Sequence, residues 1–280
     1  MRGRVALVTG GASGIGAALG EVMARDGATV VLADRQASLA EEVAAKLVRA
    51  GGRAEGVELD VRDRETFVEV ARAVQRRHGR IDYLFNNAGI AIGGEVSDYQ
   101  PTTWDTVFDV NLRGVAYGVD AVYPIMRAQR SGHIVNTASM AGLLPLAGGA
   151  SYTATKHAVV GLSKVLRVEA AQHDVRVSAL CPGAIQTPIL RGGVFGGIVG
   201  RAVSGEDADR FWQQMRPMDP IRFAELVLED VERNEPYIIV PRFWKLAWYL
   251  ERLAPRLTLE IARRFHDKTM RELVLSGGAY

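Results

Sequence analysis

Cysteine is almost absent from this chain of 280 residues, which contains a single one, Cys181. One thiol cannot form an internal disulfide, so a disulfide framework is excluded and a reducing compartment is suitable. The sequence has no run of about 18 apolar residues, and the first expected strand begins too early for an export segment to precede it. We therefore expect a cytoplasmic protein in which Cys181 serves for packing.

Basic and acidic side chains nearly balance in this sequence. The chain has 34 basic and 32 acidic side chains, a balance that gives no reason to expect nucleic acid as a partner. Its five histidines show no metal-ligand spacing, and none has a cysteine partner at a motif distance. We expect no metal site.

What the sequence does contain is an alternation of short β-branched runs with longer, alanine-rich helical patterns. The strand-like runs lie at 4–9, 28–33, 54–60, 81–86, 133–139, 175–181 and 237–240, and the helical patterns at 14–26, 37–50, 63–78, 103–129 and 152–173. The strand-like runs are apolar throughout, which is typical of a parallel sheet covered by helices on both faces. This pattern predicts an α/β fold of the Rossmann type, a doubly wound sheet of about seven strands, in a single domain over 1–240.

Two segments stand outside this alternation. Residues 191–205 are rich in glycine, which fits either a mobile lid within 188–215 or a plain surface loop. Residues 241–280 contain two amphipathic helical patterns, with eight basic and four acidic residues between 241 and 275. Such an extension could lie on a membrane surface, but we favour packing on its own domain or on a partner subunit.

A glycine-rich turn, TGGASGIG at 9–16, joins the first strand to the first helix. Glycines 10, 14 and 16 allow a tight turn and let backbone N–H groups approach a pyrophosphate at the helix N-terminus. Asp34 ends the second strand, where a carboxylate can bind the ribose of a dinucleotide and repel a 2′-phosphate. Asp34 and Ser13 favour NAD(H), whereas Arg35 leaves NADP(H) open.

Tyr152 and Lys156 are four residues apart in SYTATKHAVV, so on a helix they share one face. A tyrosine is a poor proton donor or acceptor at neutral pH because its pKa is about 10. A fixed positive charge nearby favours the phenolate and lowers that pKa. The spacing is therefore consistent with a catalytic pair.

In sequence order these pieces resemble the short-chain dehydrogenase/reductase family, in its subclass with a TGxxxGxG loop. The matching pieces are Thr9 to Gly16, Asp60 with Val61, NNAG at 86–89, Asn111, Ser139, Tyr152 with Lys156, and PGAIQTP at 182–188. The resemblance covers about residues 3–240 and leaves the extension unexplained.

The resemblance implies four catalytic residues. Tyr152 would be the general acid or base, and Lys156, with the positive nicotinamide ring, would lower its pKa and also hold the nicotinamide ribose. Ser139 would bind the substrate oxygen, and Asn111 would position a water that relays protons. The implied cofactor-binding residues are Gly10, Ser13, Gly14, Ile15, Gly16, Asp34, Arg35, Asp60, Val61, Asn87, Ala88, Gly89, Tyr152, Lys156, Pro182, Gly183, Ile185 and Thr187.

The substrate side is apolar in the sequence. The expected lining residues are Leu143, Leu144, Leu146, Val194, Phe195, Ile198 and Val199. They favour a hydrophobic secondary alcohol or ketone, steroid-like or alicyclic, over a sugar or an acyl carrier.

Three other functions are considered. An epimerase or dehydratase is disfavoured because those relatives usually have a TGxxGxxG loop. A non-catalytic NAD-binding regulator and an NADP(H)-dependent carbonyl reductase remain alternatives. The resemblance further implies a homodimer or homotetramer.

Overall fold

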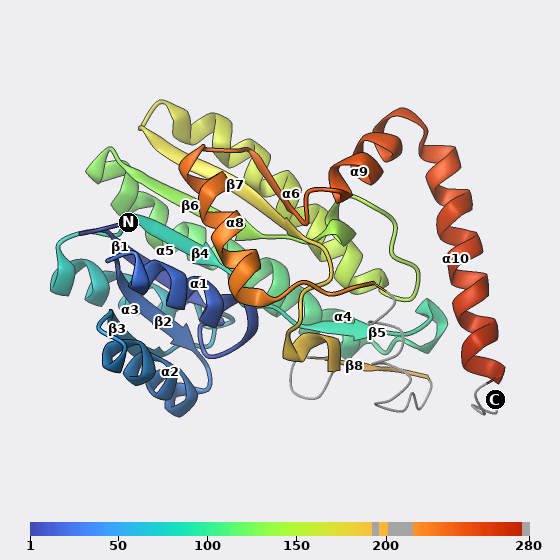
Figure 1. Cartoon of the computed structure of the whole chain (residues 1–280), viewed down its shortest axis with the longest axis horizontal. Helices are drawn as coiled ribbons and strands as arrows, with labels where there is room; N and C mark the ends of the chain where they lie inside the picture. The colour runs from blue at the N-terminus through green and yellow to red at the C-terminus, as the bar shows by residue number, and fades with distance from the viewer. Residues whose placement is uncertain (192–195, 201–214, 276–280) are drawn as a thin grey trace.

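The computed structural model describes residues 1–191, 196–200 and 215–275, and of 191, 196 and 269–275 only the backbone (Figure 1). Its centre is a seven-stranded sheet in the order β3-β2-β1-β4-β6-β7-β9, with every pairing parallel. The strands are β1 Val5–Thr9, β2 Thr29–Asp34, β3 Arg53–Glu58, β4 Tyr83–Asn86, β6 Gly132–Thr137, β7 Val175–Pro182 and β9 Tyr237–Val240. The prediction of a doubly wound parallel sheet is confirmed.

Most strands of this sheet are buried on both faces, which explains why they are largely apolar. The edge strand β3 is different, because Arg53 and Glu58 at its ends are exposed. In β1, Ala6 and Val8 belong to a core cluster shared with α1 and α8, whereas Leu7 faces a second cluster shared with α3 and α5. Successive strand residues point to opposite faces, so a sheet covered on both sides needs apolar residues at every position. The helices are α1 Gly14–Arg25, α2 Ala37–Arg49, α3 Arg64–His78, α5 Gly114–Gln129, α6 Ala150–Ala171 and α8 Pro220–Glu232.

The helical pattern expected over 103–129 is not one regular helix. It consists of α4 Pro101–Phe108, a π-helical turn over Asp109–Arg113, and α5. Asn111 lies inside the π-helical turn. Such turns often occur at functional sites because the extra residue re-aims a side chain.

Part of the expected lid forms structure that the sequence did not predict. β5, Ala91–Gly93, pairs in parallel with β8, Gly196–Ile198, in a small second sheet. Residues 192–195 and 201–214, including Val194 and Phe195, lie outside the described residues.

The extension forms α9, Trp244–Leu253, and α10, Pro255–Leu275, which runs along one end of the molecule (Figure 1). Trp244 and Trp248 of α9 pack against a core cluster of the main domain. The expected packing on the chain's own domain is therefore present for this face of α9. Elsewhere the extension leaves large apolar side chains in solvent, such as Leu246, 74% exposed, and Leu253, 84% exposed.

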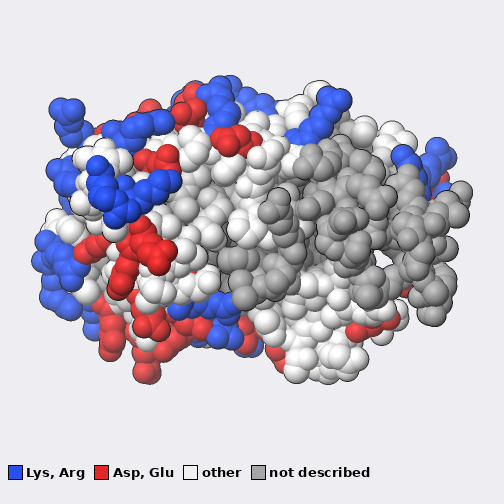
Figure 2. Space-filling model, turned by 60° about the horizontal axis from the view of Figure 1, so that its bottom comes forward, with Lys and Arg blue, Asp and Glu red and all other residues white. Residues whose placement is uncertain are grey.

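Charge on the visible surface is mixed. In Figure 2 acidic and basic side chains both gather at the end of the molecule that carries β3 and α2. Within the described ranges, no helix has a stretch both apolar and long enough to cross a bilayer.

Candidate active site

A cavity of about 1380 Å³ lies at the carboxyl edge of the sheet. The order of the strands reverses between β1 and β4, and the segments that follow these strands line the cavity. This edge is where doubly wound sheets bind their ligands. Ligand pockets usually measure about 300–1,000 Å³, so this one is large enough for more than a small substrate.

The glycine-rich turn forms the first wall. A Cβ on Gly16 would lie 2.1 Å from the carbonyl oxygen of Gly10, and one on Gly10 would lie 2.9 Å from Cα of Ala88. Only glycine fits such close backbone approaches. The side chain of Ser13 makes no capping hydrogen bond at the N-terminus of α1, so it does not occupy the helix N–H groups that can bind an anion. These features fit the pyrophosphate of a dinucleotide.

Asp34 stands at the carboxyl end of β2 with its carboxylate held in place. One oxygen accepts from the N–H of Ala12 at 3.1 Å, and the other accepts from the N–H of Gln36 at 3.0 Å. Each carboxylate oxygen can accept a second hydrogen bond. The fixed carboxylate can therefore still bind a pair of ribose hydroxyls.

Two arginines flank the same end of the cavity. Arg35 is exposed and lines it. Arg62, which the sequence analysis missed, pairs with Asp60 through Nε at 2.9 and 3.0 Å. Hydrogen bonds from Arg62 lower the pKa of Asp60, so this carboxyl stays charged beside the site.

Asn111 is completely buried beside the cavity. Its Oδ1 accepts from the N–H of Ile90 at 2.9 Å, and its Nδ2 donates to the carbonyl of Ile90 at 2.8 Å. A Cβ on Gly89 would lie 3.3 Å from Asn111 Oδ1 and 3.5 Å from Lys156 Nζ. Gly89 therefore leaves open a small space between the amide and the ammonium group.

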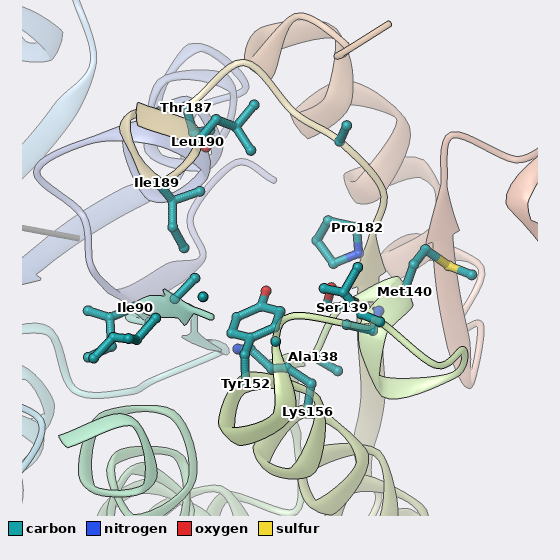
Figure 3. Close-up of a pocket in the computed structure, with 18 of the residues that line it drawn as sticks. Ile90, Ala138, Ser139, Met140, Tyr152, Lys156, Pro182, Thr187, Ile189 and Leu190 are labelled. Carbon is teal, nitrogen blue, oxygen red and sulfur yellow. Dashed lines mark hydrogen bonds between the residues drawn. The ribbon is translucent and has the colours of Figure 1, made fainter. Parts of the chain in front are cut away.

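Ser139, Tyr152 and Lys156 converge on the centre of the cavity. Tyr152 and Lys156 lie on α6, and Lys156 Nζ is 5.5 Å from the centroid of the Tyr152 ring. Lys156 Nζ also donates to the carbonyl of Thr137 at 2.8 Å, which fixes the side chain. In Figure 3 the hydroxyl of Tyr152 points into the cavity, with Ser139 to one side and Ile90 to the other.

Burial controls the proton affinities of this group. It raises the pKa of Tyr152, and the hydrogen bond with Ser139 opposes that rise only in part. It lowers the pKa of Lys156 to about 8. A buried charge is costly, so each side chain is shifted toward its neutral form. The protein groups by themselves do not produce the lower tyrosine pKa expected from this pair.

Nearly all the residues expected from the sequence line this one cavity. They are Gly10, Ser13, Gly14, Ile15, Asp34, Arg35, Asp60, Val61, Asn87, Ala88, Gly89, Ser139, Tyr152, Lys156, Pro182, Gly183, Ile185 and Thr187. Gly16 and Asn111 do not line it: Gly16 packs under the loop, and Asn111 is buried behind Gly89. Cys181 is fully buried, and burial raises the pKa of its thiol to about 12, as suits a packing residue.

The apolar wall differs in part from expectation. Leu144, Leu146, Ile198 and Val199 line the cavity. Leu143 does not, because it turns into a core cluster instead.

Several lining residues were missed by the sequence analysis. They are Ile90, Ile189 and Leu190 near Tyr152, and Trp244, Ala247, Leu250, Thr258, Ile261, Ala262, Phe265 and His266 in the extension. Four of these, at 258, 261, 262 and 265, follow a helical repeat that would have marked one face of α10. In the described part of the chain, no three His, Cys, Asp or Glu side chains come together as metal ligands would.

Comparison with known proteins agrees with the site. The family model described as short chain dehydrogenase matches residues 4–193. The 3-oxoacyl-[acyl-carrier-protein] reductase of Thermotoga maritima is 38% identical over 68% of this chain and 77% of its own. This chain therefore belongs to the short-chain dehydrogenase family and is an oxidoreductase.

Two solved structures are similar over most of the chain. A short-chain dehydrogenase/reductase from Burkholderia phymatum in complex with NAD has a TM-score of 0.82 and 33% identity, covering 91% of this chain and 95% of its own. A metagenomic short-chain oxidoreductase in complex with NADP has a TM-score of 0.63 and 36% identity, covering 77% and 91%. The cofactors of these relatives thus differ.

Proposed function

We propose that the protein is an NAD(H)-dependent oxidoreductase for a hydrophobic secondary alcohol or ketone, steroid-like or alicyclic. The observation that carries the proposal is the group of Ser139, Tyr152 and Lys156 at the junction of two unlike halves of one cavity. One half has the glycine-rich turn and Asp34, and the other is apolar. A dinucleotide fits the first half and a lipophilic substrate the second.

Tyr152 would exchange the proton of the reaction. A bound nicotinamide cofactor would supply the hydride chemistry of the reaction, in either direction. Tyr152 would take the hydroxyl proton of the alcohol in oxidation or return it to the ketone oxygen in reduction, while the Ser139 hydroxyl would hold the substrate oxygen. The carbonyl of Thr137 keeps Lys156 beside the tyrosine. Its charge, together with that of the oxidised nicotinamide, opposes the effect of burial on the tyrosine pKa.

Asn111 would support the same proton transfer by holding a water molecule near Lys156. Its side chain is fixed by two hydrogen bonds to Ile90 and faces the space beside Gly89, close to Lys156. A water in that space could pass protons between the lysine and the solvent.

NAD(H) is favoured because Asp34 places a fixed negative charge where NADP(H) would bring its 2′-phosphate. Arg35, with Arg62, supports the alternative of an NADP(H)-dependent carbonyl reductase. A titration with NADH and NADPH decides between them. Asp34→Ser should raise the NADPH to NADH ratio of kcat/KM about tenfold or more, and an unchanged ratio would show that Asp34 does not select the cofactor.

The activity itself is tested with a panel of bulky alicyclic ketones and secondary alcohols. Tyr152→Phe should reduce kcat by at least about 10²–10⁴-fold, the contribution of general acid–base catalysis. The binding of NADH should persist, because the ring of Tyr152 is retained. Binding of NADH without turnover of any substrate by the wild-type protein would instead support a non-catalytic regulator.

We also propose a cytoplasmic homodimer or homotetramer whose second interface is covered by α9 and α10. Light scattering of the full chain and of a chain ending at Arg242 provides the test. The same number of subunits in both would argue against a role of the extension in assembly.

A further inference from the structure

The extension presents one continuous face to the active-site cavity. In α10 this face consists of Thr258, Ile261, Ala262 and Phe265, at the i, i+3, i+4 and i+7 positions of a helix. In α9 it continues through Trp244, Ala247 and Leu250. Cavity walls formed by the C-terminal helices therefore lie opposite those formed by the sheet edge.

Two large apolar side chains of this face are about half exposed. Ile261 is 50% exposed and Phe265 is 45% exposed, although both line the cavity. The opposite face of α10 is charged: Glu260 pairs with Arg263 and Arg264, and Arg263 also pairs with Asp267. An amphipathic helix normally buries its apolar face in the protein core. Here that face borders an open cavity.

Trp244 connects this wall to the catalytic edge of the sheet. A Cβ on Gly183 would lie 2.4 Å from the indole Nε1 of Trp244, so the ring rests directly on the backbone after β7. The same segment, at Pro182, lines the cavity near Ser139 (Figure 3). Residues from the reacting centre, α9 and α10 thus line one cavity.

We propose that this wall is a distal binding site for the apolar body of an elongated, uncharged lipid-like substrate. The inference rests on the proposed function and goes beyond it by assigning the extension a role in substrate binding. Thr258 and Phe265 are seven positions apart, so the wall on α10 is about 10 Å long. The Thr258 hydroxyl is already used, because its one hydrogen faces two acceptors, the carbonyl of Pro255 at 3.0 Å and the carboxylate of Glu251. Among the described residues of the extension that line the cavity, His266 is the only ionisable one, so the wall offers mainly apolar contacts.

The occupant is substrate rather than cofactor because of where the wall lies. The dinucleotide half of the cavity is built on β1 and β2, near the other end of the sheet order from β7 and β9. The extension follows β9 directly. A ligand held at Ser139 and Tyr152 would therefore reach α10 with the part that points away from the nucleotide.

A series of 4-alkylcyclohexanones, from methyl to octyl, tests the proposal. For each additional methylene that reaches the distal site, kcat/KM should rise about fourfold. In the double variant Ile261→Ser/Phe265→Ser this rise should largely disappear for the longer chains. Leu259→Ser is the matched control, because Leu259 lies on the same helix, is 57% exposed and is not among the cavity residues.

The control should keep the wild-type dependence on chain length. An equal dependence in the double variant, or an equal loss in Leu259→Ser, would overturn the assignment. Binding of the same ketones to the NAD⁺-saturated protein, followed by tryptophan fluorescence, gives a second measurement. If the wild-type protein turns over no ketone, the proposed reaction fails, yet the difference in binding between the two variants still decides whether α10 contacts the ligand.

Discussion

The buried histidine of β6 should make this protein sensitive to mild acid. His133 is 2% exposed, and its Nε2 lies 2.9 Å from the hydroxyl of Ser178. Burial, followed by the positive charges of Arg176 and Arg167, lowers its pKa from 6.5 to about 3. Between these two values the unfolded chain binds a proton that the folded chain does not, so falling pH favours unfolding.

The size of the effect follows from the two pKa values. From pH 7 to pH 5 the unfolded state gains about 2 kcal/mol relative to the folded state through His133. His133→Gln keeps a polar partner for Ser178 but cannot titrate, so it should lose about 2 kcal/mol less over this range. Free energies of unfolding measured in urea at both pH values give the comparison. The same loss in wild type and variant would refute the explanation, because the other histidines are common to both.

Three further perturbations follow from the site. Gly16→Ala should weaken NADH binding at least about tenfold, since its methyl group would collide with the carbonyl of Gly10; circular dichroism should show an intact fold. Gly183→Ala should destabilise the protein by about 1–3 kcal/mol and change its tryptophan emission by displacing Trp244, whereas unaltered urea unfolding would contradict the packing. Lys156 should lose its charge as pH rises through about 8. The affinity of the free protein for NADH should therefore fall near this pH. If a Lys156→Met variant showed the same fall in affinity, the titrating group would be a different one.

Local chain order was sufficient to predict where most of the candidate residues lie. The turn at 9–16 directly joins a strand to a helix, so its place at the edge of the sheet follows from its neighbours in sequence. Tyr152 and Lys156 share one helix, whose geometry fixes their relative direction. Asp34 ends a strand, and the carboxyl ends of parallel strands meet at one edge. In each case the determining contacts are short in sequence or follow from the sheet.

The features that sequence did not predict depend on contacts between distant segments. β5 pairs with β8 across about a hundred residues, and no local pattern in three-residue strands indicates such pairing. Leu143 and Leu144 are adjacent, yet one turns into the core and the other lines the cavity. Which face of α10 points to the cavity depends on the direction in which the chain turns at Ala254, and this direction is set by the backbone angles of the folded chain.

The π-helical turn around Asn111 also bears on how this segment tolerates change. A regular α-helix advances by about 100° per residue, so removing one residue from Asp109–Arg113 would restore ordinary helical hydrogen bonding. The same deletion would rotate Asn111 away from the two backbone groups of Ile90 that now hold it. The deletion would therefore make the helix more regular but would remove the Asn111 amide from its position beside Ile90.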